Sequence, residues 1–264
     1  MAGLERTLRV LDALGLFIVT RFPFIELFTL LMSTGEKAER MPGARIFTFR
    51  DTLRREYVLV YANAAVFFVC GTGMTLDFKR RKCGFAAALH AVVYTATALF
   101  QHKSPSEYLI VRMSARTAAV CAGYLFVAGG LTDSQRGQQK VFQALQVGRQ
   151  ILAFYLFCNA YMVWASEEDR LAHYKNIPGG QLMLIAVIAL YVIPALFIYG
   201  GYEAGYFGRI AVWQLVVISA LVDFNTKYWY RSSSHMEFWS QIQHASRNIA
   251  VIGALLLLSR VRNW

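Results

Sequence analysis

Leu182–Tyr199 reads LMLIAVIALYVIPALFIY, a run of apolar residues with no charged side chain. A helix needs about 20 such residues, each rising about 1.5 Å, to cross the hydrocarbon core of a bilayer. Within lipid the backbone must satisfy its own hydrogen bonds, and one segment by itself can do so only as a helix. The run therefore predicts a transmembrane helix, which Pro194 should kink.

Seven further runs have the same apolar character. They lie at Val10–Met32, Tyr57–Leu76, Gly84–Phe100, Tyr108–Leu131, Gly148–Ala165, Ile210–Phe224 and Phe238–Leu258. Hydrophobic residues make up 56% of the chain and charged residues only 16%, against about 25% charged in a soluble domain. We therefore predict an all-α membrane protein of about eight transmembrane helices, surrounded by the lipid bilayer.

The net charge of +11 comes from basic residues at the ends of these runs, as in Lys79-Arg80-Arg81-Lys82. Such placement is typical of topology signals that face the cytosol and anionic headgroups, and we expect no nucleic-acid partner. With eight spans both termini then face the cytosol, in agreement with Arg6, Arg9, Arg260 and Arg262. The loop Ser33–Glu56 is also basic and would lie on the opposite side, which leaves the orientation open.

An internal repeat is visible at a spacing of half the chain. Three matched pairs lie 131 positions apart: Glu36 and Glu167, Arg116 and Arg247, and Val120 and Val251. We predict two tandem four-helix units, residues 1–132 and 133–264. An even number of helices per unit makes the repeats parallel, related by an axis along the membrane normal.

Ionisable side chains inside apolar runs are the candidate site, because a charge in a bilayer is costly and is commonly functional. They are Arg21, Glu26, Arg112, Arg116 and Arg247. Arg112 and Arg116 are four apart and share a helix face, and Glu107, Glu26 or lipid phosphate could pair with them. The commoner alternative is that these residues snorkel to the interface or form structural salt bridges.

Other polar residues receive simpler interpretations. Asp223 and Asn225 are expected at an interfacial helix end, and His173 and His235 in solvated loops. Interhelical hydrogen bonds are expected of Asn63, His90 and Asn159. The cysteines, which include no CxxC pair, are expected to be ordinary core residues: Cys70, Cys83, Cys121 and Cys158.

Motifs of enzymes are missing from the sequence. It contains no HExxH, GxSxG, P-loop or GxGxxG at a strand–helix junction, and its histidines have no ligand spacing. We therefore expect neither enzymatic activity nor a cofactor or metal.

Several segments, in the same order along nearly the whole chain, resemble the transmembrane protein 101 family. They are Thr20–Phe24, Glu36–Arg40, Lys79–Arg81, Val111–Thr117, Glu168–Ala172, Pro178–Met183 and Glu237–Trp239. The resemblance implies an eight-span protein without established enzymatic activity that promotes NF-kappaB signalling. More distantly, the four-helix unit and Arg247–Gly253 resemble the Surfeit-locus cargo receptors and DoxX-like proteins.

Two alternative functions follow from these observations. One is an endoplasmic-reticulum cargo receptor or membrane chaperone that holds client proteins between its halves, although the chain ends in Arg-Val-Arg-Asn-Trp without a dilysine signal. The other is a small-anion transporter that uses the intramembrane arginines. We expect an endomembrane location, endoplasmic reticulum or Golgi, rather than the plasma membrane. A mitochondrial inner-membrane location stays open, because the N-terminus is basic and weakly amphipathic.

Overall fold

A computed structural model describes residues 2–39, 55–101, 107–131, 138–225, 228 and 238–259, and the regular structure in these ranges is helical. The helices are α1 Ala2–Glu39, α3 Arg55–Thr75, α4 Arg80–Gln101, α5 Glu107–Gly129, α6 Gln138–Ala165, α7 Glu167–Asn176, α8 Gly180–Gly200, α9 Ala204–Ile218, the π-helix η1 Ser219–Asp223, and α11 Phe238–Ser259. The predicted all-α class is confirmed for the part of the chain described.

Seven helices in the described ranges are long and apolar enough to cross a bilayer: α1, α3, α4, α5, α8, α9 continued by η1, and α11. The remaining predicted span is α6, which begins at Gln138 rather than Gly148 and carries Arg149, Gln150 and Asn159. Its 28 residues exceed the length that a span requires, but α6 is not one of the seven. An eighth span therefore stays a prediction.

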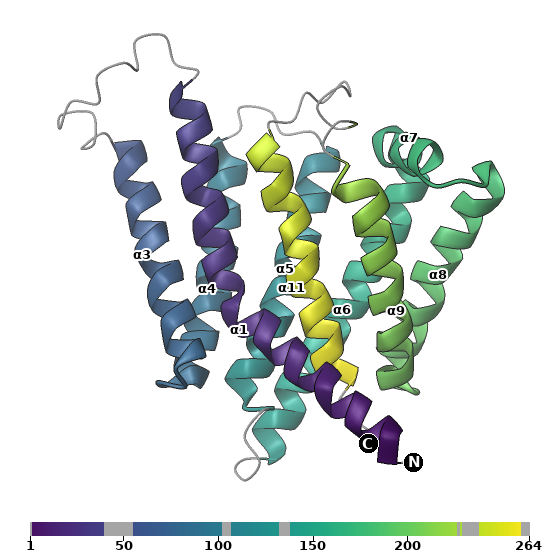
Figure 1. Cartoon of the computed structure of the whole chain (residues 1–264), viewed down its shortest axis with the longest axis horizontal. Coiled ribbons are helices and arrows are strands. Elements are labelled where there is room, and N and C mark those ends of the chain that lie inside the picture. Colours follow the sequence, from purple (N-terminus) through teal and green to yellow (C-terminus); the bar gives the residue numbers. More distant parts are fainter. Residues whose placement is uncertain are drawn as a thin grey trace.

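The helices stand side by side, and α1 begins at the same end of the bundle at which α11 ends (Figure 1). The short helix α7 lies at the opposite end (Figure 1). The predicted eight spans would give this arrangement, because an even number of crossings returns the chain to the side on which it began. That the shared end faces the cytosol stays a prediction, because most of the conflicting loop Ser33–Glu56 and residues 260–262 lie outside the described ranges.

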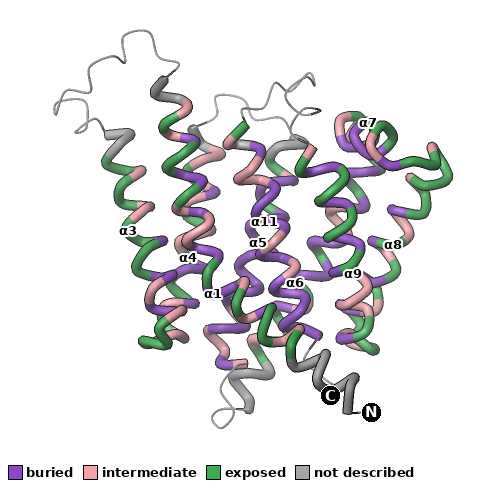
Figure 2. Tube along the Cα trace, viewed as in Figure 1, coloured by how far each residue is buried: buried purple, intermediate pink, exposed green. Residues whose placement is uncertain are grey.

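The core of the bundle is built around α5 and α11. In the most apolar segment of each of these two helices, 72% of the residues are buried. The corresponding share is 28% or less in α3, α4 and α8. Figure 2 shows the same contrast between the middle of the bundle and its flanks. α5 packs against α4, α6 and α11, and α11 packs against α1 and α9. The division into two tandem units stays a prediction.

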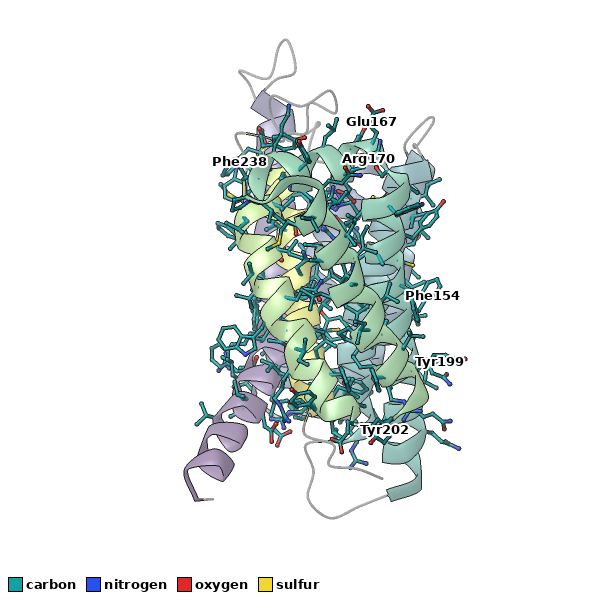
Figure 3. The ribbon with its side chains drawn as sticks, turned by 90° about the vertical axis from the view of Figure 1, so that its right-hand side faces the viewer. Phe154, Glu167, Arg170, Tyr199, Tyr202 and Phe238 are labelled. Atoms are coloured by element: carbon teal, nitrogen blue, oxygen red, sulfur yellow. The ribbon has the colours of Figure 1, made fainter. Side chains whose placement is uncertain are left out.

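Large apolar side chains also cover the outside of the bundle, as expected of a surface that meets lipid tails. Figure 3 shows Phe154, Tyr199 and Tyr202 pointing away from the helices. Tyr199 lies in the last turn of α8 and Tyr202 in the turn that follows it, where amphipathic rings prefer the headgroup level. The exposed Trp164, near the end of α6, follows the same rule.

Close contact between α1 and α11 depends on glycine. A Cβ added at Gly15 would lie 2.8 Å from Leu256 Cβ and 3.0 Å from the Gly253 carbonyl oxygen. Small residues allow membrane helices to approach in this way. We expect Gly15→Ala to destabilise the fold by about 1–3 kcal/mol through overpacking, measured as a lower melting midpoint in mild detergent.

Gly35 provides the matched control on the same helix, because an added Cβ there meets nothing within 4 Å. Gly35→Ala should be neutral or slightly stabilising, since alanine favours a helix over glycine by about 0.8–1.0 kcal/mol. Equal midpoints for the two variants would show that the α1–α11 contact tolerates a methyl group.

Candidate functional site

Buried ionisable residues of the described ranges gather in two clusters inside the bundle. The Asp223 cluster contains Arg112, Arg116, Asp169, Asp223 and Asn248, and the Glu26 cluster contains Glu26, Tyr94, Thr117, Gln243 and Arg247. Each cluster joins helices that are far apart in the sequence.

Asp223 pairs with both arginines of α5. Its Oδ1 lies 2.9 Å from Arg112 Nη2 and 2.7 Å from Arg116 Nη2, and all three side chains are buried. The shared face of Arg112 and Arg116 is therefore confirmed. The partner is a carboxylate of η1, not the expected Glu26 or lipid phosphate, and the side chain of Glu107 lies outside what the structure describes.

A π-helical turn presents Asp223 to the cluster. α9 widens into η1, where the Phe224 amide donates to the Ser219 carbonyl five residues earlier at 2.9 Å. Asn248 of α11 then donates to both Ser219 Oγ at 3.0 Å and Asp223 Oδ2 at 2.7 Å. Such turns are rare and occur frequently at functional sites. Asp223 was expected at a simple interfacial end, and the structure instead buries it.

Helix α7 covers this cluster at one end of the bundle (Figure 1), and its local sequence explains why it forms. Ser166 caps its start by accepting from the Asp169 amide, and three acidic residues in the first turn complement the helix dipole. Asp169 and His173, four apart, both face inward and are buried. Asp169 Oδ1 lies 3.6 Å from Arg112 Nη1. The expectation that His173 is solvated was wrong.

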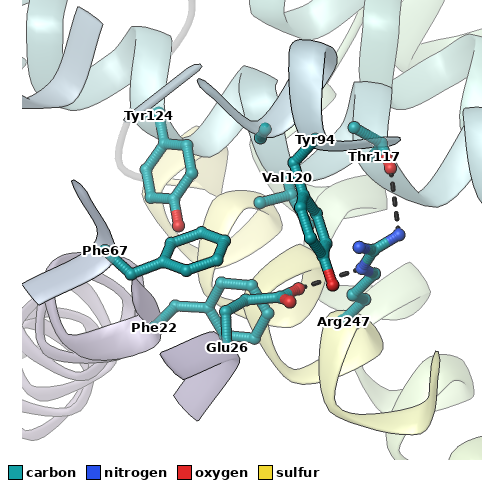
Figure 4. Close-up of a pocket in the computed structure, with 9 residues that line it drawn as sticks. Phe22, Glu26, Phe67, Tyr94, Thr117, Val120, Tyr124 and Arg247 are labelled. Carbon is teal, nitrogen blue, oxygen red and sulfur yellow. Dashed lines mark hydrogen bonds and ion pairs between the residues drawn. The ribbon is translucent and has the colours of Figure 1, made fainter. Parts of the chain in front are cut away.

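The Glu26 cluster centres on an ion pair between α1 and α11, drawn in Figure 4. Arg247 Nε donates to Glu26 Oε1 at 2.9 Å, and its Nη1 donates to Thr117 Oγ1 of α5 at 3.1 Å. Gln243 Nε2 lies 3.2 Å from Glu26 Oε2 and 3.1 Å from the Tyr94 hydroxyl. One cluster therefore connects α1, α4, α5 and α11.

Beside Glu26 lies a cavity of about 10 Å³, enclosed mainly by apolar and aromatic side chains such as Phe22, Phe67 and Tyr124 (Figure 4). This is close to the space that one water molecule requires. It does not accommodate a substrate of several heavy atoms.

The two clusters meet between α5 and α11. Arg116 on α5 donates through Nη1 to the His244 carbonyl of α11 at 3.0 Å, while Arg247 on α11 reaches Thr117 on α5. Arg116 and Arg247, which occupy equivalent positions of the predicted repeat, thus each form a hydrogen bond to the helix that carries the other. Polar contacts in both directions tie the two most buried helices together.

Four of the five candidate residues, Glu26, Arg112, Arg116 and Arg247, are buried in these clusters. Arg21 is the exception: it is exposed, and its guanidinium lies 4.0 Å from the centre of the Phe17 ring. We therefore exclude Arg21 from the candidate site. It lies five residues from Glu26, on another face of α1, and points outward.

Further members of the clusters were not predicted from the sequence as site residues: Tyr94, Thr117, Asp169, Asp223, Gln243 and Asn248. Only Asp223 and Asp169 carried a signal, since each is an acid near the end of an apolar run. The neutral residues are indistinguishable in sequence from helix-surface residues. His90 and Asn63 form the expected interhelical hydrogen bond at 2.9 Å, whereas Asn159 donates to Tyr155 within its own helix.

Tyr155 of α6 supports the Asp223 cluster through its hydroxyl, which donates to Asn248 Oδ1 at 3.0 Å. We expect Tyr155→Phe to destabilise the fold by about 1–3 kcal/mol, because the buried Asn248 oxygen loses its donor. Thermal melting in detergent measures the change. Tyr161→Phe, at an exposed position of the same helix, should leave the melting midpoint unchanged. If both variants lowered the midpoint equally, the role given to the Tyr155–Asn248 hydrogen bond would be contradicted.

Charges inside the clusters balance. Arg112 and Arg116 are matched by Asp223 and Asp169, and Arg247 is matched by Glu26. A buried pair of this kind is strongly destabilising to break, because the remaining partner becomes an uncompensated charge. The arrangement is suited to fixing the relative positions of helices.

Comparison with known protein families places the chain beside one family model. The model of the TMEM101 protein family matches residues 4–261, nearly the whole chain. No solved structure matches the fold.

Proposed function

The chain belongs to the TMEM101 protein family, and on that premise we propose that it is a non-enzymatic, multi-pass membrane protein that promotes NF-kappaB signalling through protein partners. The signalling role rests on the family resemblance. The structural observation that supports a scaffold is the internal pairing of the intramembrane charges: Arg112 and Arg116 with Asp223, and Arg247 with Glu26. These charges are paired with one another inside the bundle, so contacts with partners would involve its outer surface.

The small-anion transporter gains no support from this geometry. An anion would have to compete with Asp223 for two arginines that it already contacts at 2.9 and 2.7 Å. The role of cargo receptor stays a prediction. A client-binding groove between the two halves would have to lie elsewhere than at the places where α1 packs against α11 and α5 packs against α6.

A deletion-and-rescue experiment tests the signalling role. Deleting the gene should reduce an NF-kappaB reporter response, and re-expression at the natural level should restore it. An unrelated eight-span protein at the same level controls for membrane overload. If the deletion leaves the reporter unchanged, or the unrelated protein restores it equally, the proposed function is wrong.

Exposed lysines offer a way to locate the partner surface. Lys79 lies in the turn between α3 and α4, and Lys82 lies in the first turn of α4. Both are at the end of the bundle where α1 begins, which we propose is cytosolic. Lys79→Ala/Lys82→Ala should weaken rescue of the reporter if partners dock there. Lys175→Ala, exposed on α7 at the opposite end, is the control and should rescue fully.

We further propose an endoplasmic-reticulum or Golgi location. Tagging the endogenous protein and imaging it beside markers of the endoplasmic reticulum, Golgi and mitochondria tests this proposal. Staining confined to mitochondria would contradict it.

A further inference from the structure

The cavity beside Glu26 is bordered by a buried hydroxyl group that has no partner. Tyr124 of α5 lines this cavity and is only 2% exposed. No hydrogen bond joins its hydroxyl to the described part of the chain. Buried tyrosine hydroxyls usually find a partner, so an unbonded one at the edge of a cavity requires an explanation.

A second hydroxyl at the same cavity lacks an acceptor for its hydrogen. Tyr94 of α4 also lines the cavity, and its oxygen lies 3.1 Å from Gln243 Nε2. That nitrogen lies 3.2 Å from Glu26 Oε2 as well, and because an ionised carboxylate can only accept, the amide NH2 group donates to both oxygens. Tyr94 therefore accepts from Gln243, and its own O–H has no acceptor among the residues that the structure describes.

Glu26 supplies acceptors beside these two donors. Its Oε1 accepts from Arg247 Nε and its Oε2 from Gln243 Nε2, which uses two of the roughly four acceptor sites of a carboxylate. Figure 4 shows the Tyr94 hydroxyl beside this carboxylate and the Tyr124 hydroxyl pointing into the group of side chains that encloses the cavity. Two donors and a carboxylate with acceptor sites to spare thus line a space of about the size of one water molecule.

Water satisfies all three groups at once. It can accept from two hydroxyls and donate to a carboxylate, which gives three hydrogen bonds, the usual number of about three for a buried water. We propose that one ordered water occupies this cavity and bridges the hydroxyls of Tyr94 and Tyr124 to the carboxylate of Glu26.

Other occupants of this size match the lining less well. A metal cation would lie close to the guanidinium of Arg247, which also lines the cavity, and would find three oxygen groups where Mg²⁺ or Ca²⁺ takes about six or more oxygen ligands. A halide ion would lie against the carboxylate of Glu26. Most of the lining is apolar, but the three oxygen groups are sufficient to bind a water.

The water extends the Glu26 cluster to two further side chains. Direct hydrogen bonds join Glu26 of α1 to Gln243 and Arg247 of α11. Through the water, the same carboxylate also binds Tyr94 of α4 and Tyr124 of α5. One acidic side chain then connects α1 to three other helices, and loss of the water should weaken their packing.

A structure of the full chain in lipid nanodiscs tests the proposal, at a resolution that shows ordered water elsewhere in the protein. One density peak is expected within about 3.5 Å, the usual limit for a hydrogen bond, of both the Tyr124 hydroxyl and a carboxylate oxygen of Glu26. If the map shows waters elsewhere but none in this cavity, the proposal is overturned.

Tyr124→Phe adds a measurement in detergent solution, because it removes the hydroxyl and keeps the ring. Loss of a hydrogen bond to water should lower the melting midpoint by roughly 2–4 °C. A dry hydroxyl would be an unsatisfied group, so its removal would leave the midpoint unchanged or raise it, which would contradict the proposal. Tyr161→Phe, exposed on α6, is the control and should not change the midpoint. If Tyr124→Phe does not fold, the wild-type density alone decides.

Discussion

Asp223→Asn should destabilise the folded protein by about 3–5 kcal/mol, the cost of removing one partner from a buried ion pair. Asp223 balances two arginines at once, at 2.9 and 2.7 Å, and Arg112, Arg116 and Asp223 are all buried. The asparagine keeps the size of the side chain but leaves the positive charge of α5 compensated only by Asp169, 3.6 Å from Arg112. The measurement is the melting midpoint, together with the fraction of monodisperse protein after solubilisation.

Asp77→Asn is the matched control. Asp77 also pairs with an arginine, Arg80, at 3.0 Å, but its side chain is 65% exposed. An exposed pair contributes about 1 kcal/mol or less, so this variant should melt close to the wild type. If Asp77→Asn and Asp223→Asn lowered the melting midpoint by comparable amounts, burial of the Asp223 cluster would have no energetic consequence, contrary to the structure.

Glu26 and Arg247 should show strong coupling in a double-mutant cycle. Glu26→Gln leaves Arg247 without its carboxylate, 2.9 Å away in the structure, and should cost about 3–5 kcal/mol. Arg247→Met leaves Glu26 buried without a cation and should also be destabilising. Because the double variant buries no unpaired charge, it should lose less than the sum of the single variants, with a coupling energy of about 1–3 kcal/mol.

Thr117 supplies the control for this cycle, because it contacts Arg247 through a neutral hydroxyl at 3.1 Å. Thr117→Val should cost about 1–3 kcal/mol, less than either charged variant, by leaving a guanidinium donor unbonded. Additive losses for Glu26→Gln and Arg247→Met would contradict the ion pair, since residues in direct contact are expected to couple.

The amino-acid sequence by itself determined the membrane character and most helix positions. Runs such as Leu182–Tyr199 and Tyr57–Leu76 became α8 and α3 with small changes at their ends, because apolar length and backbone satisfaction in lipid are local properties. The same logic identified Arg112 and Arg116 as neighbours on one face. Helix α7 was missed because it is short and polar and has no apolar run, although Ser166 and the acids that follow form a capping signal.

Only the tertiary structure decided which charges meet. Glu26 and Arg247 are separated by nearly the whole chain, and Asp223 reaches the arginines of α5 because α9 ends in a π-helical turn beside α11. Helix spacing specifies the face that a side chain occupies, but the neighbour of that face depends on how the helices pack. For this reason Arg21 and Glu26 looked alike in the sequence, while the fold exposes one to the surroundings and buries the other between α1 and α11.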